Sequence, residues 1–178
     1  AKATVEELRK AGQNDEADQF ESEVAKSRQR DAIVKVTWTG DADVDLMIEE
    51  PGGTICSLQN PRTTSGGVML GDAYASGDEV NGYTETYICP QGFNGQYRML
   101  VHRVWGKVTA GKVTVDIYTR NSETPHIHQQ IELDDKNAVV LFDVEQGGRV
   151  MPLAHQQLAN LRKERVAADR AMVARQLS

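Results

Sequence analysis

The spacing of the apolar residues changes near residue 31, and this change constrains the fold more than any other feature. Before it they recur every three or four residues, as in a helix; after it they alternate with polar residues, as in a strand. Val34, Val36 and Trp38 are the first to alternate. Further segments follow, separated by Gly, Pro and Asn turns, at residues 43–49, 54–57, 68–72, 84–89, 97–102, 112–118, 128–133 and 139–144. About nine short strands without an intervening helix predict an antiparallel β-sandwich or jelly roll.

One face of the predicted strands is apolar and should form the core. The residues expected there are Trp38, Val44, Leu46, Ile48, Tyr97, Met99, Val101, Val113, Val115 and Ile117. Each side chain of this kind stabilises a fold by ~1.5–3 kcal/mol when it is buried.

Helical spacing precedes and follows the predicted sandwich. Val5 and Leu8 share one helical face, Gly12 supplies a stop, and Asn14 caps a second helix. A hairpin this thin cannot bury its apolar stripe alone. It is either the end of a tetratricopeptide-type array or a plain hairpin that packs on the sandwich. Pro152 opens a last, basic helix. The expected domains are a hairpin, a sandwich and a C-terminal helix, at residues 1–30, 31–150 and 151–178.

The charge of the chain argues against nucleic acid as a partner. The 178 residues have a formal net charge of −6, and the segment 31–151 contains seventeen acidic and nine basic residues. A phosphate backbone is bound by clustered Lys and Arg, which this segment lacks.

No apolar run reaches the ~20 residues of a membrane-spanning helix, so we expect no membrane insertion. Because the chain starts inside a helical pattern without an initiator Met, we expect a fragment or a processed product.

The two cysteines, Cys56 and Cys89, both lie in strand-like segments. Two thiols cannot make a tetrahedral zinc site on their own. Their number leaves two alternatives open, one disulfide or two buried small apolar residues.

An acidic segment, Asp41, Asp43 and Asp45, is the strongest candidate for a binding site. The segment opens like an EF-hand loop, but Leu46 stands where the loop needs Gly and Gly52 where it needs Glu, which excludes that motif. On a strand the three carboxylates would share one face, where like charges need compensation. Calcium is one candidate for that compensation, and pairing with Arg or solvation is the other. Further oxygen ligands for calcium could come from nearby segments, at Asn60, Asp72 and Glu85.

The order of several short motifs resembles a known family. They are Val36-Thr37-Trp38, Asp43-Val44-Asp45-Leu46, Pro51-Gly52-Gly53, Asn60-Pro61-Arg62, Ser65-Gly66-Gly67 and the run from Gly95 to Val101. Across Val34 to Tyr118 the chain resembles a bacterial YfaP-like domain of unknown function. The resemblance implies a place beside helical repeats in large envelope-associated proteins of planctomycete-like bacteria. The chain departs from the family pattern at Met47, where a His is common, and at Gly82-Tyr83-Thr84-Glu85. The family has no established activity, so the resemblance implies a fold and no function.

Enzymatic motifs find little support in the sequence. His126, His128 and Glu132 would share a strand face and resemble the first metal motif of cupins, but the glycines that flank such a motif and a second ligand segment are missing. No Gly-x-Ser-x-Gly elbow and no phosphate-binding glycine loop is present. We therefore expect a chain that is not an enzyme.

Three functions remain as hypotheses. The leading one is a non-catalytic interaction or scaffold module of a larger bacterial protein, which binds a protein partner or other domains of the same chain. The second is a calcium-dependent glycan or peptide binder at the cell envelope or outside the cell, with Tyr74 and Tyr83 as its loop aromatics. The third is a cupin-like metalloenzyme. A cytoplasmic location stays open.

Overall fold

The computed structural model describes residues 2–28, 30–74, 82–120, 122–133 and 137–176. Its helices are α1 (Lys2–Lys10), α2 (Asn14–Arg28) and α3 (His155–Gln176), and it has a 3-10 turn, η1 (Thr109–Gly111). Its strands are β1 (Ala32–Trp38), β2 (Ala42–Glu49), β3 (Ile55–Cys56), β4 (Val68–Tyr74), β5 (Tyr83–Cys89), β6 (Gly95–Gly106), β7 (Lys112–Thr119), β8 (Ile127–Glu132) and β9 (Asn137–Val144).

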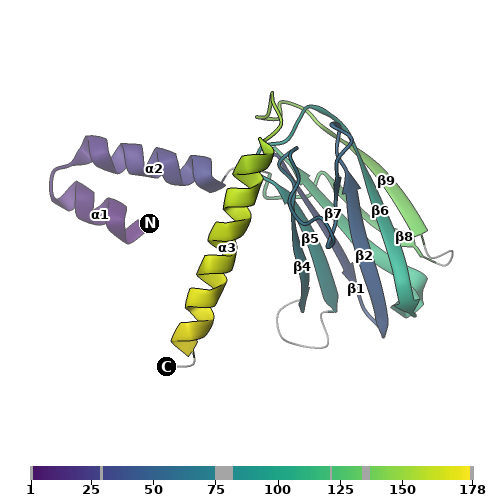
Figure 1. Ribbon diagram of the computed structural model, residues 1–178. Coiled ribbons are helices and arrows are strands. Elements are labelled where there is room, and N and C mark those ends of the chain that lie inside the picture. The colour runs from purple at the N-terminus through teal and green to yellow at the C-terminus, as the bar shows by residue number, and fades with distance from the viewer. Residues whose placement is uncertain (1, 29, 75–81, 121, 134–136, 177–178) are drawn as a thin grey trace.

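The strands form two antiparallel sheets that pack face to face (Figure 1). The five-stranded sheet has the order β4-β5-β1-β7-β8, and the four-stranded sheet has the order β3-β2-β6-β9. All pairings are antiparallel. Within the described part of the chain, the segment between β1 and β9 contains no helix longer than η1. The predicted antiparallel sandwich, with a helical hairpin before it and a helix after it, is therefore confirmed.

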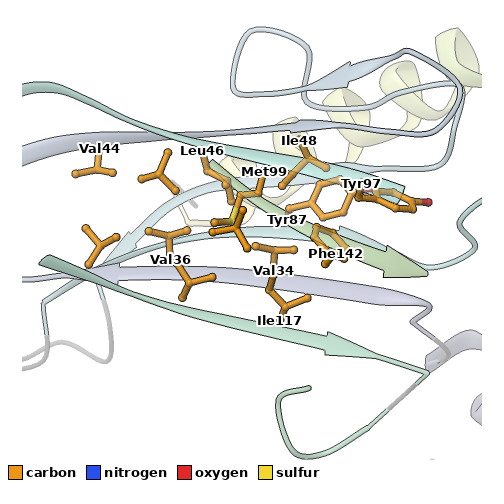
Figure 2. Close-up of a cluster of buried hydrophobic side chains, with 14 of the residues drawn as sticks. Val34, Val36, Val44, Leu46, Ile48, Tyr87, Tyr97, Met99, Ile117 and Phe142 are labelled. Atoms are coloured by element: carbon orange, nitrogen blue, oxygen red, sulfur yellow. The ribbon is translucent and has the colours of Figure 1, made fainter. Parts of the chain in front are cut away.

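The core lies between the two sheets and follows the alternation seen in the sequence. β1 and β2 bury every second residue, so Val34 and Val36 of one sheet face Leu46 and Ile48 of the other (Figure 2). Tyr97 stacks on Phe142 at one end of the core, with ring centroids 5.2 Å apart. All ten residues predicted for the core belong to this buried cluster.

A buried polar network joins the two sheets at one end of the sandwich. Glu50 follows β2 directly and is buried, and its Oε1 accepts a hydrogen bond from the Tyr87 hydroxyl at 2.8 Å. Its Oε2 accepts from the Thr54 hydroxyl at 2.6 Å, and that hydroxyl also lies 2.7 Å from the Ser65 hydroxyl. A Cβ at Gly67 would collide with Glu50 and Tyr87. The glycine-rich motifs after residues 50 and 64 therefore leave room for these hydrogen bonds. Through them the buried Glu50 carboxyl group finds its donors.

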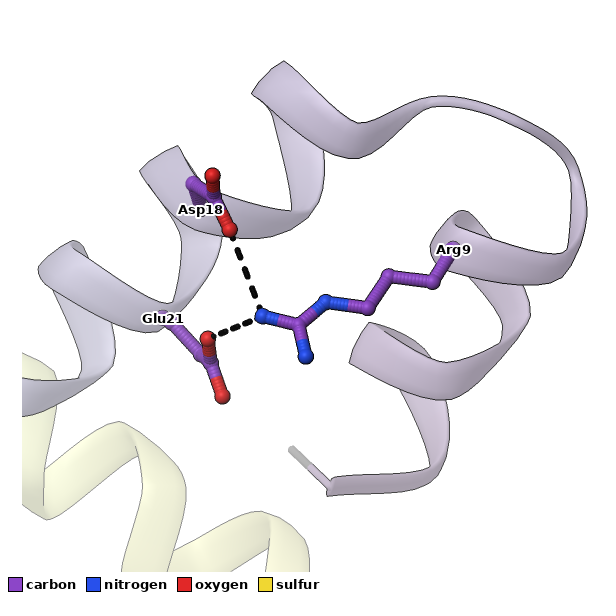
Figure 3. A network of polar contacts seen from close by, with 3 residues as sticks. All are labelled: Arg9, Asp18 and Glu21. Carbon is purple, nitrogen blue, oxygen red and sulfur yellow. Dashed lines mark hydrogen bonds and ion pairs between the residues drawn. The ribbon is translucent and has the colours of Figure 1, made fainter.

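The N-terminal segment is the expected helical hairpin, and Gly12 turns the chain with a φ of 78°. Arg9 Nη2 of α1 lies 3.3 Å from Asp18 Oδ1 and 2.7 Å from Glu21 Oε2 of α2, so one guanidinium ties the two helices together (Figure 3). Because these side chains are exposed, the ion pairs contribute little. The hairpin extends away from the sandwich (Figure 1).

The C-terminal helix begins at His155, three residues later than Pro152 suggested. The Leu153 N–H donates to Thr64 O at 2.7 Å, which holds the chain in an extended path against the β3–β4 loop. The Gln157 side chain then accepts from the Ala154 N–H at 3.2 Å and caps the first turn. Among the described side chains of α3, Leu158 is the one that is buried.

Candidate functional site

The predicted acidic cluster is only partly assembled. Asp43 and Asp45 lie on the face of β2 that points away from the core, as the alternation required. Asp41 precedes the strand and is exposed, and its backbone oxygen accepts from the Lys107 N–H at 2.9 Å. Asp41 therefore does not continue the face formed by Asp43 and Asp45.

Two of the other predicted calcium ligands make hydrogen bonds within the fold. Glu85 is 0% exposed between the sheets, and its Oε2 accepts from the Leu46 N–H at 2.6 Å. Asn60 lies in the β3–β4 loop and donates its side-chain amide to Ile55 O at 2.9 Å. Asp72 is opposite Glu85 in the β4–β5 register, and its side chain lies outside the described residues. Among the described side chains, Asp43 and Asp45 are the predicted ligands that share one open face.

We predict that calcium does not change the stability of the protein. Calcium takes six to eight oxygen ligands, and two carboxylates on an open sheet face supply too few. Across the described residues, no group of three or more His, Cys, Asp or Glu side chains is arranged to hold a metal. A site filled at a hundred times its Kd would stabilise the fold by ~2.7 kcal/mol. Thermal melts with millimolar calcium and with EDTA should coincide; a calcium-dependent rise that the Asp43→Asn, Asp45→Asn double variant abolishes would contradict the prediction.

The two cysteines are free thiols, buried at the edge of the core. Burial, reinforced by the nearby Glu50, raises the pKa of Cys56 to about 12. Burial also raises the pKa of Cys89 to about 11. Since the thiolate is the reactive form, both groups should be inert at neutral pH.

We predict that an aromatic disulfide reagent labels neither cysteine of the native protein at pH 7. The comparison is made over the time in which the same reagent labels the unfolded protein completely. Denaturant should expose both thiols, so two equivalents should react. Fast labelling before unfolding would contradict the buried placement, and zero equivalents after unfolding would reveal a disulfide instead.

The residues of the cupin-like pattern do not converge. His126 and His128 are exposed on the outer side of the five-stranded sheet, away from the core. His128 Nδ1 donates to Asp116 Oδ1 at 2.6 Å, and Glu132 lies 3.5 Å from Lys112 Nζ. These contacts are cross-strand pairs on a solvated face.

We call the side of the four-stranded sheet that points away from the core the outer face. A row of apolar side chains crosses this outer face. Met47, Leu100 and Val139 occupy one register position on β2, β6 and β9. Val139 is 53% exposed, and Leu141, two residues further along β9, is 51% exposed. The apolar row therefore crosses three strands without interruption.

Polar groups flank the apolar row on both sides. On one side Asp45 lies opposite His102, whose Nδ1 donates to Asn137 Oδ1 at 2.6 Å. On the other side Glu49 lies opposite Arg98, with 3.5 Å between their charged groups. An apolar centre with a polar rim is the usual composition of a protein-binding surface.

Trp105 extends the outer face at its far end. It lies opposite Asp43 in the β2–β6 register and is 55% exposed. Of the aromatics proposed as a glycan platform, Tyr83 instead stacks on the buried Trp38 at 5.8 Å between ring centroids. Tyr74 has its side chain outside the described residues.

The sequence analysis did not predict this row, because its three residues come from strands that are distant in the sequence. A usable signal was present at the end of the sandwich, where residues 139–142 are apolar at four consecutive positions. A strand with that pattern has apolar side chains on both faces.

Comparisons with known proteins add little. No protein-family model and no curated protein sequence matches the chain. Among solved structures, a crystal structure of DUF4425, a domain of unknown function from Bacteroides vulgatus ATCC 8482, matches with a TM-score of 0.30 and 13% sequence identity. It covers 64% of this chain and 91% of its own. A likeness at this level supports neither a fold nor a function. No helix in the described part of the chain is long and apolar enough to cross a membrane.

Proposed function

We propose that the chain is a non-catalytic interaction module that binds a partner protein through the outer face. The observation that carries the proposal is the apolar row of Met47, Leu100 and Val139 with its polar rim. Side chains of this kind are ordinarily scattered singly on a monomer, and a contiguous patch marks a contact surface. The resemblance to YfaP-like domains supports a place for this module in a larger bacterial protein of the cell envelope. The hairpin would then be the end of a helical repeat that positions it.

Burial of the row would supply the affinity, and its rim would supply the specificity. Apolar surface removed from water contributes roughly 25 cal/mol per Å². Charged groups such as Asp45, Glu49 and Arg98 keep wrong partners away and orient the right one. A face built on strands is also rigid, which lowers the entropic cost of binding.

A glycan is the second candidate, and the exposure of Trp105 beside Asp43 favours it. An indole face packs on a sugar ring while a carboxylate accepts hydrogen bonds from sugar hydroxyls. This reading needs Trp105 and leaves Met47 and Leu100 without a role.

The test begins with capture of proteins on the immobilised chain and ends with one purified partner. We expect the Met47→Lys, Leu100→Lys double variant to weaken the Kd for that partner by at least about tenfold in titration calorimetry, or ~1.4 kcal/mol. Leu70→Lys is the matched control, because Leu70 is 52% exposed but lies on β4 of the other sheet. A face variant that binds like the wild-type protein would overturn the proposal. Glycan binding that is lost with Trp105→Ala alone would favour the second candidate.

A further inference from the structure

The two sheets have four edge strands, β4 and β8 in one and β3 and β9 in the other. An exposed edge is a template for strand pairing, and proteins protect such edges with short strands, bulges, charges or proline. Three of these edges are protected. β3 has two residues, the β4 register breaks between Met69 and Asp72, and β8 follows Pro125 and carries mostly His, Gln and Glu.

The fourth edge, β9, carries one charged residue, Asp143, near its end and has none of the other protective features. It has eight residues without Pro, Lys or Arg, and it pairs with β6 over its whole length without a bulge. Both faces of β9 carry apolar side chains. Val140 and Phe142 point into the core, and Val139 and Leu141 lie on the outer face. A long apolar edge without a bulge is the kind that ordinarily pairs with another strand.

The open side of β9 is accessible to another strand. In an antiparallel pair, alternate residues direct their N–H and C=O groups away from the neighbouring strand. Among the described residues, the backbone of β9 makes hydrogen bonds with β6 alone. A cleft of about 670 Å³ borders Leu141, Phe142 and Asp143, and its other wall includes Thr119, Thr124 and Ile127.

We propose that β9 pairs with β9 of a second copy of this chain, antiparallel and about a twofold axis. Paired residues must point to the same side of the joined sheet, so only alternate registers are allowed. With Val140 opposite Val140 of the second copy, Val139 faces Leu141 and Asn137 faces Asp143. Apolar side chains then meet apolar ones on both faces, and the carboxylate faces an amide.

Charge selects this register over its neighbour. Asp143 is the charged residue of β9, and in the proposed pairing it meets no second carboxylate. Moving the axis to Leu141 would instead place the apolar Val139 opposite Asp143. An isologous contact of this kind closes after two copies, which a twofold axis requires.

The pairing joins the two outer faces into one surface. The apolar row of each copy ends at Val139, next to the pairing edge, so the two rows come to lie on the same side of the joined sheet. The inference goes beyond the proposed function, because self-association requires no other partner.

The test measures the dimerisation Kd of the purified full chain by analytical ultracentrifugation at physiological salt, where the repulsion of two chains of net charge −6 is screened. We expect a concentration-dependent dimer that the Val139→Lys, Leu141→Lys double variant weakens at least about tenfold. Leu70→Lys controls for an added charge at equal exposure, and Leu100→Lys controls for association through the outer face. Both should dimerise like the wild-type chain.

Three results would overturn the proposal: a chain that stays monomeric up to about millimolar concentration, a dimer unaffected by the edge substitutions, or a dimer that Leu100→Lys disrupts equally.

Hydrogen exchange of the wild-type chain keeps the test valid if the double variant fails to fold. Every second amide of β9 should exchange fast in dilute solution and more slowly at high concentration. Unchanged exchange in a dimeric sample would contradict edge pairing. Unchanged partner binding by the Met47→Lys, Leu100→Lys variant, in a chain that dimerises normally, would count against the proposed function alone.

Discussion

Leu46→Ala should lower the free energy of unfolding by about 2–5 kcal/mol. Leu46 is 1% exposed and lies at the centre of β2, where its side chain packs between Val36 of the opposite sheet and the other buried residues of its own (Figure 2). Truncation to Ala removes the transfer free energy of the lost carbons and leaves a cavity that rigid strands on both sides cannot close. Urea-induced unfolding at equilibrium measures the loss directly.

Met47→Ala is the matched control, because Met47 is the next residue of the same strand and points to the outer face. It should cost less than about 1 kcal/mol, since a partly exposed side chain leaves no closed cavity. Equal losses for the two variants would mean that β2 does not alternate between core and solvent. A loss below about 0.5 kcal/mol for Leu46→Ala would place Leu46 in solvent and the register in error.

The fold was predictable because the information that specifies it is local. A strand with one buried face needs apolar residues at alternate positions, and Val44, Leu46 and Ile48 show this pattern within five residues. A one-residue slip would turn all of them to solvent, so the pattern also determines which face is buried.

The outer face could not be predicted in the same way, because it depends on pairing between distant segments. Met47, Leu100 and Val139 come from three strands far apart in the chain, and each alone is an unremarkable partly exposed residue. Only the register of β2, β6 and β9 brings them into one row.

Glu85 was misassigned for a different reason, since a local signal for its position existed. Residues 85, 87 and 89 are two apart, and Tyr87 and Cys89 are both buried. Alternation therefore turns Glu85 inward, although an acid in a strand is more often found on the exposed face. Its chemistry suggested a ligand, while its place in the strand made it part of the core.

The second large effect concerns this residue: Glu85→Ala should lower the free energy of unfolding by about 2–4 kcal/mol. β3 pairs with β2 only at Ile48 and Glu49. The Leu46 N–H, two residues before this pairing, therefore has no acceptor on β3. The Glu85 carboxyl group crosses from the five-stranded sheet and accepts this hydrogen bond at 2.6 Å. Removing it leaves a buried N–H unsatisfied and a cavity between the sheets, and an unsatisfied buried donor alone costs about 1–3 kcal/mol.

Two further variants separate the hydrogen bond from the other effects of the substitution. Glu85→Gln keeps an acceptor oxygen within reach of the Leu46 N–H, so it should lose only about 1 kcal/mol. Glu49→Ala removes a carboxylate that is exposed and paired with Arg98 at 3.5 Å, and its loss should stay below about 1 kcal/mol. In hydrogen exchange, the Leu46 amide should be protected in the wild-type protein and in Glu85→Gln, and should exchange faster in Glu85→Ala. If all three variants unfold at the wild-type denaturant concentration, Glu85 does not bridge the sheets. The Glu85 side chain would then not point into the core.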